Sequence, residues 1–218
     1  NDRIFLLTTP QGLYSPYKGA TFMLTKRMSN NWQGVISLVL SKAEGRIASS
    51  ARMGPSNSQT SASGTFGRDI AGPNDYVNTE GRLLGDKPVV AKAQVVYSFP
   101  WGIMASANVQ HQTGRLWSRQ LRPAGLGFPS PPTINMESNT GDRRVPDVDL
   151  LDLRVQKSFV FGDSGTRFDV FLDGLNMTNS DSSESIASQL GTAAVTAFGV
   201  PTRYTYPRRL QLGAKIRW

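Results

Sequence analysis

The 218-residue sequence contains no cysteine and only one histidine, His111. Without cysteine there is no disulfide framework, no thiolate zinc site and no thiol nucleophile. A single histidine makes histidine-based metal sites and Ser-His or Cys-His catalysis hard to build. No P-loop, Rossmann fingerprint or HExxH motif is present. We therefore expect no cofactor, no metal centre and no enzymatic activity.

Long apolar runs are also missing. No stretch of eighteen apolar residues occurs, which argues against a transmembrane helix. The N-terminus lacks the features of a signal peptide and does not begin with Met, so we expect a piece of a longer chain or a processed product. The net charge of +8 is spread along the chain, which argues against a nucleic-acid partner.

Alternating polarity is the strongest positive signal, and it indicates strands with one apolar and one polar face. It is clearest in residues 209–218, whose even positions are Leu, Leu, Ala, Ile and Trp and whose odd positions are Arg, Gln, Gly, Lys and Arg. Six more segments lie within residues 20–25, 32–41, 89–99, 103–112, 151–159 and 167–173. The misfits are Lys157 on an apolar face and Val35, Val39 and Phe171 on polar faces.

Very short and very long connections alternate between these segments. The short ones are residues 27–31, 100–102 and 162–165, and the long ones span roughly 44–88, 113–148 and 177–207. Outer-membrane barrels have this organisation, with short periplasmic turns and long extracellular loops. The sequence predicts an all-β fold: an antiparallel transmembrane β-barrel segment of seven or eight up-and-down strands in the outer membrane of a Gram-negative bacterium. Residues 3–7 fit either the end of an eighth strand or a loop segment.

Large aromatic residues gather at the predicted short-turn ends, where a barrel carries an aromatic girdle at the membrane interface. We predict this role for Trp32, Phe99, Trp101, Phe159, Phe161, Phe168 and Trp218. Lys157 lies near the same end, where its long side chain can reach the head groups. The alternative fold is a soluble, secreted β-sandwich or barrel whose apolar face is a core. That alternative does not explain why long loops gather at one end.

Several stretches share the order and spacing of one known family. They are Tyr17-Lys18-Gly19, residues 24–33 (LTKRMSNNWQ), 41–45 (SKAEG), 97–102 (YSFPWG), 108–114 (NVQHQTG), 151–157 (LDLRVQK), 171–179 (FLDGLNMTN), 198–201 (FGVP) and 207–218 (PRRLQLGAKIRW). Together they resemble TonB-dependent receptors, particularly the Oar-like group with a carboxypeptidase-regulatory-like N-terminal domain. The resemblance covers nearly the whole chain beyond about Tyr17.

The resemblance implies that residues 1–218 are the C-terminal part of a receptor barrel of about 22 strands with a plugged lumen. It implies as partners the protein's own plug and the TonB complex, both through an N-terminal part outside this chain. Outer-membrane lipid and lipopolysaccharide are further expected partners. So is the barrel-assembly machinery, which reads a C-terminal strand such as the one ending at Trp218. With open edges, the isolated chain is not expected to transport.

The leading functional hypothesis is active, TonB-coupled uptake of a large nutrient, such as an iron chelate, a glycan or a peptide. A passive porin-type channel and a soluble binding or adhesion module are the alternatives. We predict a polar lumen lining that contacts the plug rather than substrate, formed by Lys92, Gln94, Asn108, Gln110, Arg154, Gln156, Asp169 and Asp173. An extracellular loop carries candidate ligand-binding residues for an anion or lipopolysaccharide phosphate: Arg115, Trp117, Arg119 and Arg122. The alternative is a solvated loop with a single aromatic anchor.

Two sequence features that resemble a catalytic site and a metal site have simpler explanations. Residues 162–165 (GDSG), preceded by His111 and Asp147, match the order of a serine-protease triad, but they sit where a tight turn is predicted. Some loop carboxylates could bind Ca²⁺, but their spacing matches no EF-hand and a solvated, salt-bridged loop is the favoured explanation. They are Asp147, Asp149 and Asp152, or Asp181 with Glu184. His111 is expected to be a hydrogen-bonded residue at the outer rim.

Overall fold

The computed structural model describes residues 12, 14–46, 77–78, 80–83, 85–121, 134–138, 142–162, 165–187, 189–190 and 199–218. Within these residues the fold is all-β, with one short 3-10 turn, η4 (Pro100–Gly102). No helix among the described residues is long and apolar enough to cross a membrane. Residues 3–7 and Arg122 lie outside the described residues, as do Asp163 and Ser164 of the GDSG motif.

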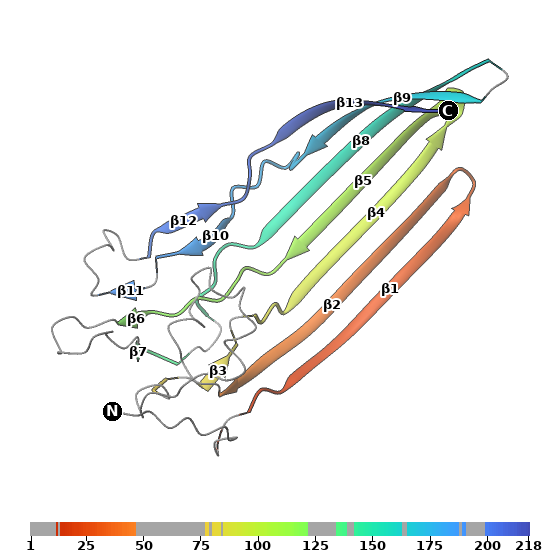
Figure 1. Ribbon diagram of the computed structural model, residues 1–218. Helices are drawn as coiled ribbons and strands as arrows, with labels where there is room; N and C mark the ends of the chain where they lie inside the picture. The colour runs from red at the N-terminus through yellow and green to blue at the C-terminus, as the bar shows by residue number, and fades with distance from the viewer. Residues whose placement is uncertain are drawn as a thin grey trace, which may run out of the picture.

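One antiparallel sheet of eight strands dominates the molecule (Figure 1). Seven long strands follow one another in chain order across it: β1 (Tyr17–Ser29), β2 (Trp32–Arg46), β4 (Val89–Phe99), β5 (Ile103–Gln112), β8 (Val148–Phe161), β9 (Thr166–Leu175) and β13 (Arg209–Arg217). The eighth, β3 (Glu80–Arg82), pairs with the end of β2. Each of the seven predicted alternating segments falls on one of the long strands, so the predicted all-β, antiparallel, up-and-down order is confirmed.

Three tight connections lie at one end of the sheet, which we call the turn end (Figure 1). Asn30 and Asn31 have φ of 52° and 66°, the pair of positive angles that a two-residue hairpin turn requires. β1 therefore continues to Ser29, and this turn is shorter than the predicted link of residues 27–31. Gly102 has φ of 72°, and a Cβ there would lie 2.8 Å from the Ser158 carbonyl oxygen. Glycine is thus required for this turn to approach β8.

The long connections all leave the opposite end, which we call the loop end (Figure 1). Short strands add local pairing there: β6 (Gln120–Leu121), β7 (Ile134–Asn135), β10 (Ser183–Ile186), β11 (Gln189–Leu190) and β12 (Pro201–Tyr204). β10 pairs with β12, and β6 pairs with both β7 and β11. The loop end is therefore itself structured in its described part.

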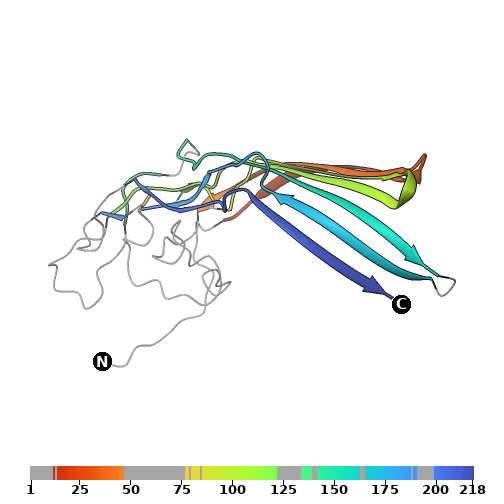
Figure 2. The same cartoon turned by 90° about the horizontal axis from the view of Figure 1, so that it is seen from above.

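The main sheet is curved but open (Figure 2). β1 and β13 are its edges, and each has one partner among the described strands. Both edge strands run from the loop end toward the turn end. The described strands therefore form an open, curved sheet and not a closed barrel.

Little apolar surface is buried. Among the described residues, only three apolar side chains are buried, namely Leu116, Val145 and Val148. All three lie in or beside the β5–β8 connection at the loop end. The long strands therefore do not enclose a hydrophobic core of their own.

Candidate functional site

The strand register gathers most of the apolar residues of the seven long strands on one side of the sheet, which we call the apolar face. One cross-strand row from β2 to β13 reads Trp32, Tyr97, Ala105, Val155, Leu172 and Leu212. Strand side chains alternate between faces, so a register slip of one residue would move a whole strand's apolar set to the other side. All seven strands are paired in the register that places their predicted apolar positions on the same side of the sheet.

This apolar face is uncovered. The exposed fraction of the residue is 69% for Leu24, 54% for Val155 and 74% for Leu212. Soluble monomers rarely expose contiguous apolar patches larger than a few hundred Å². The apolar face therefore needs a covering medium or partner.

Polar or aromatic rims bound the apolar face at both ends. The loop-end rim consists of Lys18, Lys42, Glu44, His111 and Asp149. In it, Lys42 pairs with Glu44 at 2.5 Å, and His111 Nδ1 lies 2.7 Å from Asp149 Oδ1. The turn-end rim consists of Lys26, Trp32, Tyr97, Phe99, Trp101, Lys157, Phe159, Phe161 and Trp218. His111 is thus hydrogen-bonded at the end of β5, on the apolar face, as predicted for its side chain.

All seven aromatics predicted for the membrane interface lie toward the turn end. Tyr97, which the sequence analysis did not single out, packs 4.5 Å from Phe99 between ring centroids. Phe159 lies 6.4 Å from Phe168 and 6.5 Å from Phe161. Trp101, in η4, is 82% exposed. The rings form a belt along one end of the apolar face.

The eight residues predicted to line a lumen all lie on the opposite side of the sheet, which we call the polar face. The register pairs Lys92 with Gln110 and Gln94 with Asn108. Arg154 stands opposite Asp173, and its guanidinium donates to that carboxylate through two bonds of 2.5 and 2.7 Å. Such a bidentate pair fixes both side chains along the face.

A second buried carboxylate, Asp169, continues this ladder toward the turn end. It accepts a hydrogen bond of 2.5 Å from the Ser158 hydroxyl and one from Arg217 on β13. Phe171, a misfit in the sequence pattern, lies under the Arg154 guanidinium at 4.4 Å. Gly213 gives the Phe171 ring space, since a Cβ there would come within 2.4 Å of the ring. The ladder thus ties β8, β9 and β13 together.

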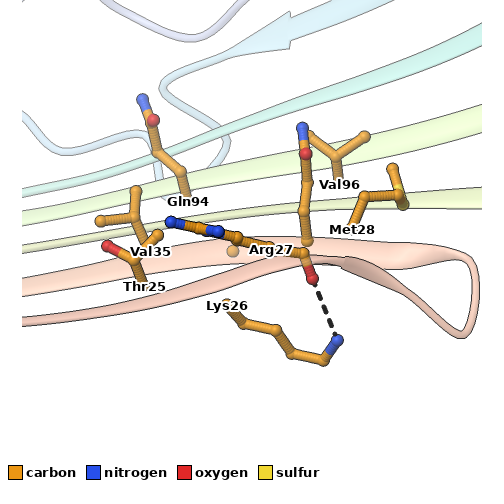
Figure 3. A pocket seen from close by; sticks show the side chains of 9 residues that line it. Thr25, Lys26, Arg27, Met28, Val35, Gln94 and Val96 are labelled. Atoms are coloured by element: carbon orange, nitrogen blue, oxygen red, sulfur yellow. Dashed lines mark hydrogen bonds between the residues drawn. The ribbon is translucent and has the colours of Figure 1, made fainter.

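A hollow of about 310 Å³ lies at the turn end of β1, β2 and β4 (Figure 3). It is lined by Thr25, Lys26, Arg27, Met28, Gln33, Gly34, Val35, Gln94 and Val96. In Figure 3 the Arg27 side chain runs along the sheet, while Lys26 points to the other side of β1. The guanidinium and the two glutamine amides can bind carbonyl or carboxylate groups of whatever packs against the polar face.

The predicted ligand-binding cluster is largely engaged in pairing within the protein. Arg119 donates to Glu137 through bonds of 3.1 and 2.7 Å, and Arg143 donates to the same carboxylate at 2.5 Å. Arg143 also lies 5.6 Å from the Trp117 ring centroid. Arg115 is partly buried, and that burial lowers its pKa. The loop therefore presents less unpaired positive charge than its sequence suggests.

Asp86 forms a clasp at the loop end that the sequence analysis missed. Its buried carboxylate accepts from the Ala43 backbone N–H at 2.7 Å and from Arg82 and Arg144 at 3.2 and 2.6 Å. Arg144 also donates to the carbonyl oxygens of Asp86 and Gly114. The end of β2, the β2–β4 connection and the β5–β8 connection meet at this one carboxylate. No short-range pattern reveals it, because Asp86 and Arg144 are far apart in sequence.

Asn176, at the end of β9, is a second missed residue. It is buried with φ of 50°. Its amide donates to the carbonyl oxygens of Ser180 and Tyr206 at 2.9 and 2.8 Å, and it accepts from Ser180 N–H at 2.9 Å. Its backbone N–H donates to Asp152 Oδ1 at 2.9 Å. Asparagine tolerates this left-handed backbone conformation. An asparagine directly after an alternating segment was therefore the sequence signal that could have identified this corner.

The acidic residues considered for Ca²⁺ point to separate partners. Asp147 accepts from Gly114 N–H at 2.7 Å, Asp149 faces His111, and Glu184 pairs with Arg203 at 3.0 Å. The described residues contain no group of three or more acidic or histidine side chains placed to hold a metal ion.

The fold and its two contrasting faces thus define an antiparallel, amphipathic β-sheet protein. No model of a known protein family matches the chain, and no curated protein matches it significantly.

Replacing Asn176 with alanine is expected to destabilise the β9 corner by about 2–3 kcal/mol, because buried carbonyl and N–H groups lose their partners. Hydrogen exchange of the residues 176–182 backbone measures this opening. Asn179→Ala is the matched control, since its side chain accepts one exposed bond, from Arg208 N–H. Equal effects of the two substitutions would contradict the central role of Asn176.

The Glu137 pairing is expected to weaken in acid. Hydrogen bonds from Arg119 and then Arg143 lower the pKa of Glu137 from 4.5 to about 2. A depressed carboxyl pKa contributes stability that is complete above pH 4.5 and is lost as the pH falls through about 2. Backbone N–H groups of Trp117 and Met136, which bond across this loop, should exchange faster in that window. Glu137→Gln should exchange faster at neutral pH and lose the acid dependence; an unchanged profile would contradict the assignment.

Proposed function

We propose that this chain is part of the β-barrel of an outer-membrane, TonB-dependent active transporter for a large nutrient, such as an iron chelate, a glycan or a peptide. The observation that supports the membrane placement most strongly is the continuous, uncovered apolar face on seven registered strands. Lipid is a medium that covers such a face without a protein partner.

The height of the apolar face fits a bilayer. Asp149 and Lys157 bound it on β8, eight residues apart in sequence. Strands rise about 3.4 Å per residue, so the separation is about 27 Å along the strand. A strand tilt of about 40°, usual for outer-membrane barrels, reduces this to about 20 Å across the membrane, near the usual height of about 25 Å. Charged and aromatic rims then fall at the two interfaces.

The two open edges support the proposal that this sheet is one part of a larger barrel. β1 and β13 run in the same direction, so they cannot pair antiparallel with each other. Bacterial outer-membrane barrels are antiparallel with an even number of strands. Closing this sheet therefore needs an odd number of further strands. The TonB-dependent receptors that the sequence resembles have a barrel of about 22 strands, which is large enough to contain these further strands.

Active uptake is preferred to a passive channel because of that sequence resemblance. In this proposal the structured loop end faces the outside and captures the nutrient, and the polar face lines the lumen and contacts the plug. The turn end faces the periplasm. A soluble sandwich requires a second apolar sheet to cover the first, and the described residues contain only one large sheet.

Bilayer recordings of the whole purified protein that carries this chain test the proposal. A plugged transporter should insert and stay closed without TonB, and cells should take up its nutrient only when the inner membrane is energised. Stepwise conductance from the unmodified protein would favour the passive channel. A protein that stays monomeric in solution without detergent would contradict the membrane placement altogether.

A further inference from the structure

We infer that the turn-end rim of the apolar face binds the phosphate groups of anionic phospholipids, through Lys26 and Lys157. This inference rests on the proposed membrane insertion and adds a lipid preference to it. The two lysines lie on β1 and β8, separated by three intervening strands of the sheet. They therefore mark two well-separated points of one rim.

Lys26 is held at the rim by its own hairpin. Its ammonium donates to Ser29 Oγ at 2.5 Å and to the Arg27 and Ser29 carbonyl oxygens at 3.3 and 3.2 Å. It lies 4.3 Å from the centroid of the Trp32 ring. These contacts turn the ammonium toward the turn end, on the side of β1 away from the polar face (Figure 3). All its partners are neutral, so its positive charge is not compensated by them.

Lys157 repeats the arrangement on another hairpin. It donates to the Trp101 carbonyl oxygen and lies 5.4 Å from the Phe159 ring centroid. Its alkyl stem crosses the apolar face while the ammonium reaches the turn, as expected for a lysine at a membrane interface. This explains the misfit in the alternating pattern. Again the partners in the described chain are neutral.

The loop-end rim differs in charge. There, Lys42 is paired with Glu44 and His111 with Asp149, so acids accompany the basic groups. On the apolar face of the described turn-end rim, no aspartate or glutamate side chain accompanies Lys26 and Lys157. Asp163, between β8 and β9 in sequence, is outside the described residues. The buried Asp169 is on the polar face, paired with Arg217. The apolar face is thus electrically asymmetric along the strands.

A phospholipid phosphate is the anion that fits the two lysines of the turn-end rim. Acyl chains cover the apolar face, and the attached phosphate then lies at the height of the two ammonium groups. A basic residue near an anionic membrane surface contributes about 1 kcal/mol, a factor of about five. Two lysines therefore predict a preference of about 25-fold at most for anionic over zwitterionic lipid at this rim.

The test uses the whole protein, reconstituted in vesicles of phosphatidylethanolamine with a minority of phosphatidylglycerol. Mass spectrometry of the gently released protein counts the retained phosphatidylglycerol molecules. The variants are Lys26→Gln with Lys157→Gln, and a charge-preserving pair, Lys26→Arg with Lys157→Arg. Lys18→Gln is the matched control, because it removes an apolar-face lysine from the loop end of the same strand.

Wild type, the arginine pair and Lys18→Gln are expected to retain phosphatidylglycerol, and the glutamine pair should lose most of this retention. Equal retention by the glutamine pair, or an equal loss in Lys18→Gln, would overturn the lipid inference while leaving insertion intact. Failure of the wild type to insert into any vesicle would instead overturn the proposed function. The two failures are therefore distinguishable.

Discussion

Replacing Leu153 with arginine is expected to destabilise the membrane-embedded protein by about 2–4 kcal/mol, the cost of a cation at the bilayer midplane on a barrel's lipid face. Leu153 lies on the apolar face of β8, midway between Asp149 and Lys157, and is 39% exposed. In water such a half-exposed site would accept arginine at little cost. Denaturant unfolding of the protein in vesicles gives the change in unfolding free energy.

Gln94→Arg is the matched control for this substitution. Gln94 lies at the same height on the polar face, opposite Asn108 and close to Asp152 in the register. We expect a change below about 1 kcal/mol there, because a lumen-facing cation remains solvated. Equal costs at both positions, or no cost at Leu153, would contradict a lipid-facing assignment of the apolar face.

Replacing Asp86 with alanine is expected to cost about 3–5 kcal/mol, the usual effect of removing one partner of a buried ion pair. The substitution removes the carboxylate that accepts from Arg82, Arg144 and the Ala43 N–H, and leaves Arg144 only its backbone carbonyl acceptors. Loss of the clasp should separate the β5–β8 connection from the end of β2. Hydrogen exchange at Ala43 and faster proteolysis of the β5–β8 connection measure this opening.

Glu184→Ala is the control for the clasp. It also removes a carboxylate with an arginine partner, Arg203, but both side chains are about half exposed. Exposed pairs contribute at most about 1 kcal/mol, so this variant should behave almost as wild type. A comparable loss in the two variants would show that the Asp86 clasp does not organise the loop end.

The sheet was predictable from sequence because each strand carries its own period-two pattern. Residues 209–218 show the pattern without any knowledge of the partner strand, and β13 follows it in register with β9. Lys157 and Phe171 broke the pattern, and both depend on contacts across strands, with Trp101 and with Arg154 and Gly213. Local sequence cannot show such contacts.

The loop end was much less predictable. Arg119 was predicted to bind a ligand, and in the structure it pairs with Glu137, eighteen residues away. Asp86 and Arg144 meet although 58 residues separate them. Long-range ion pairs follow from tertiary packing, and no periodicity marks them. Sequence periodicity therefore predicts which face of the sheet a strand residue occupies. The ion pairs that organise the loop end are visible only in the structure.

The most direct test of the central claim is a nitroxide scan along β8. The chain has no cysteine, so single cysteines at positions 149–160 can carry the label without background from this chain. With the whole protein in vesicles, odd positions from 151 to 155 should be accessible to lipid-soluble oxygen, and even positions to a water-soluble relaxant. Water access at the odd positions, or no difference between odd and even positions, would contradict an apolar face covered by lipid.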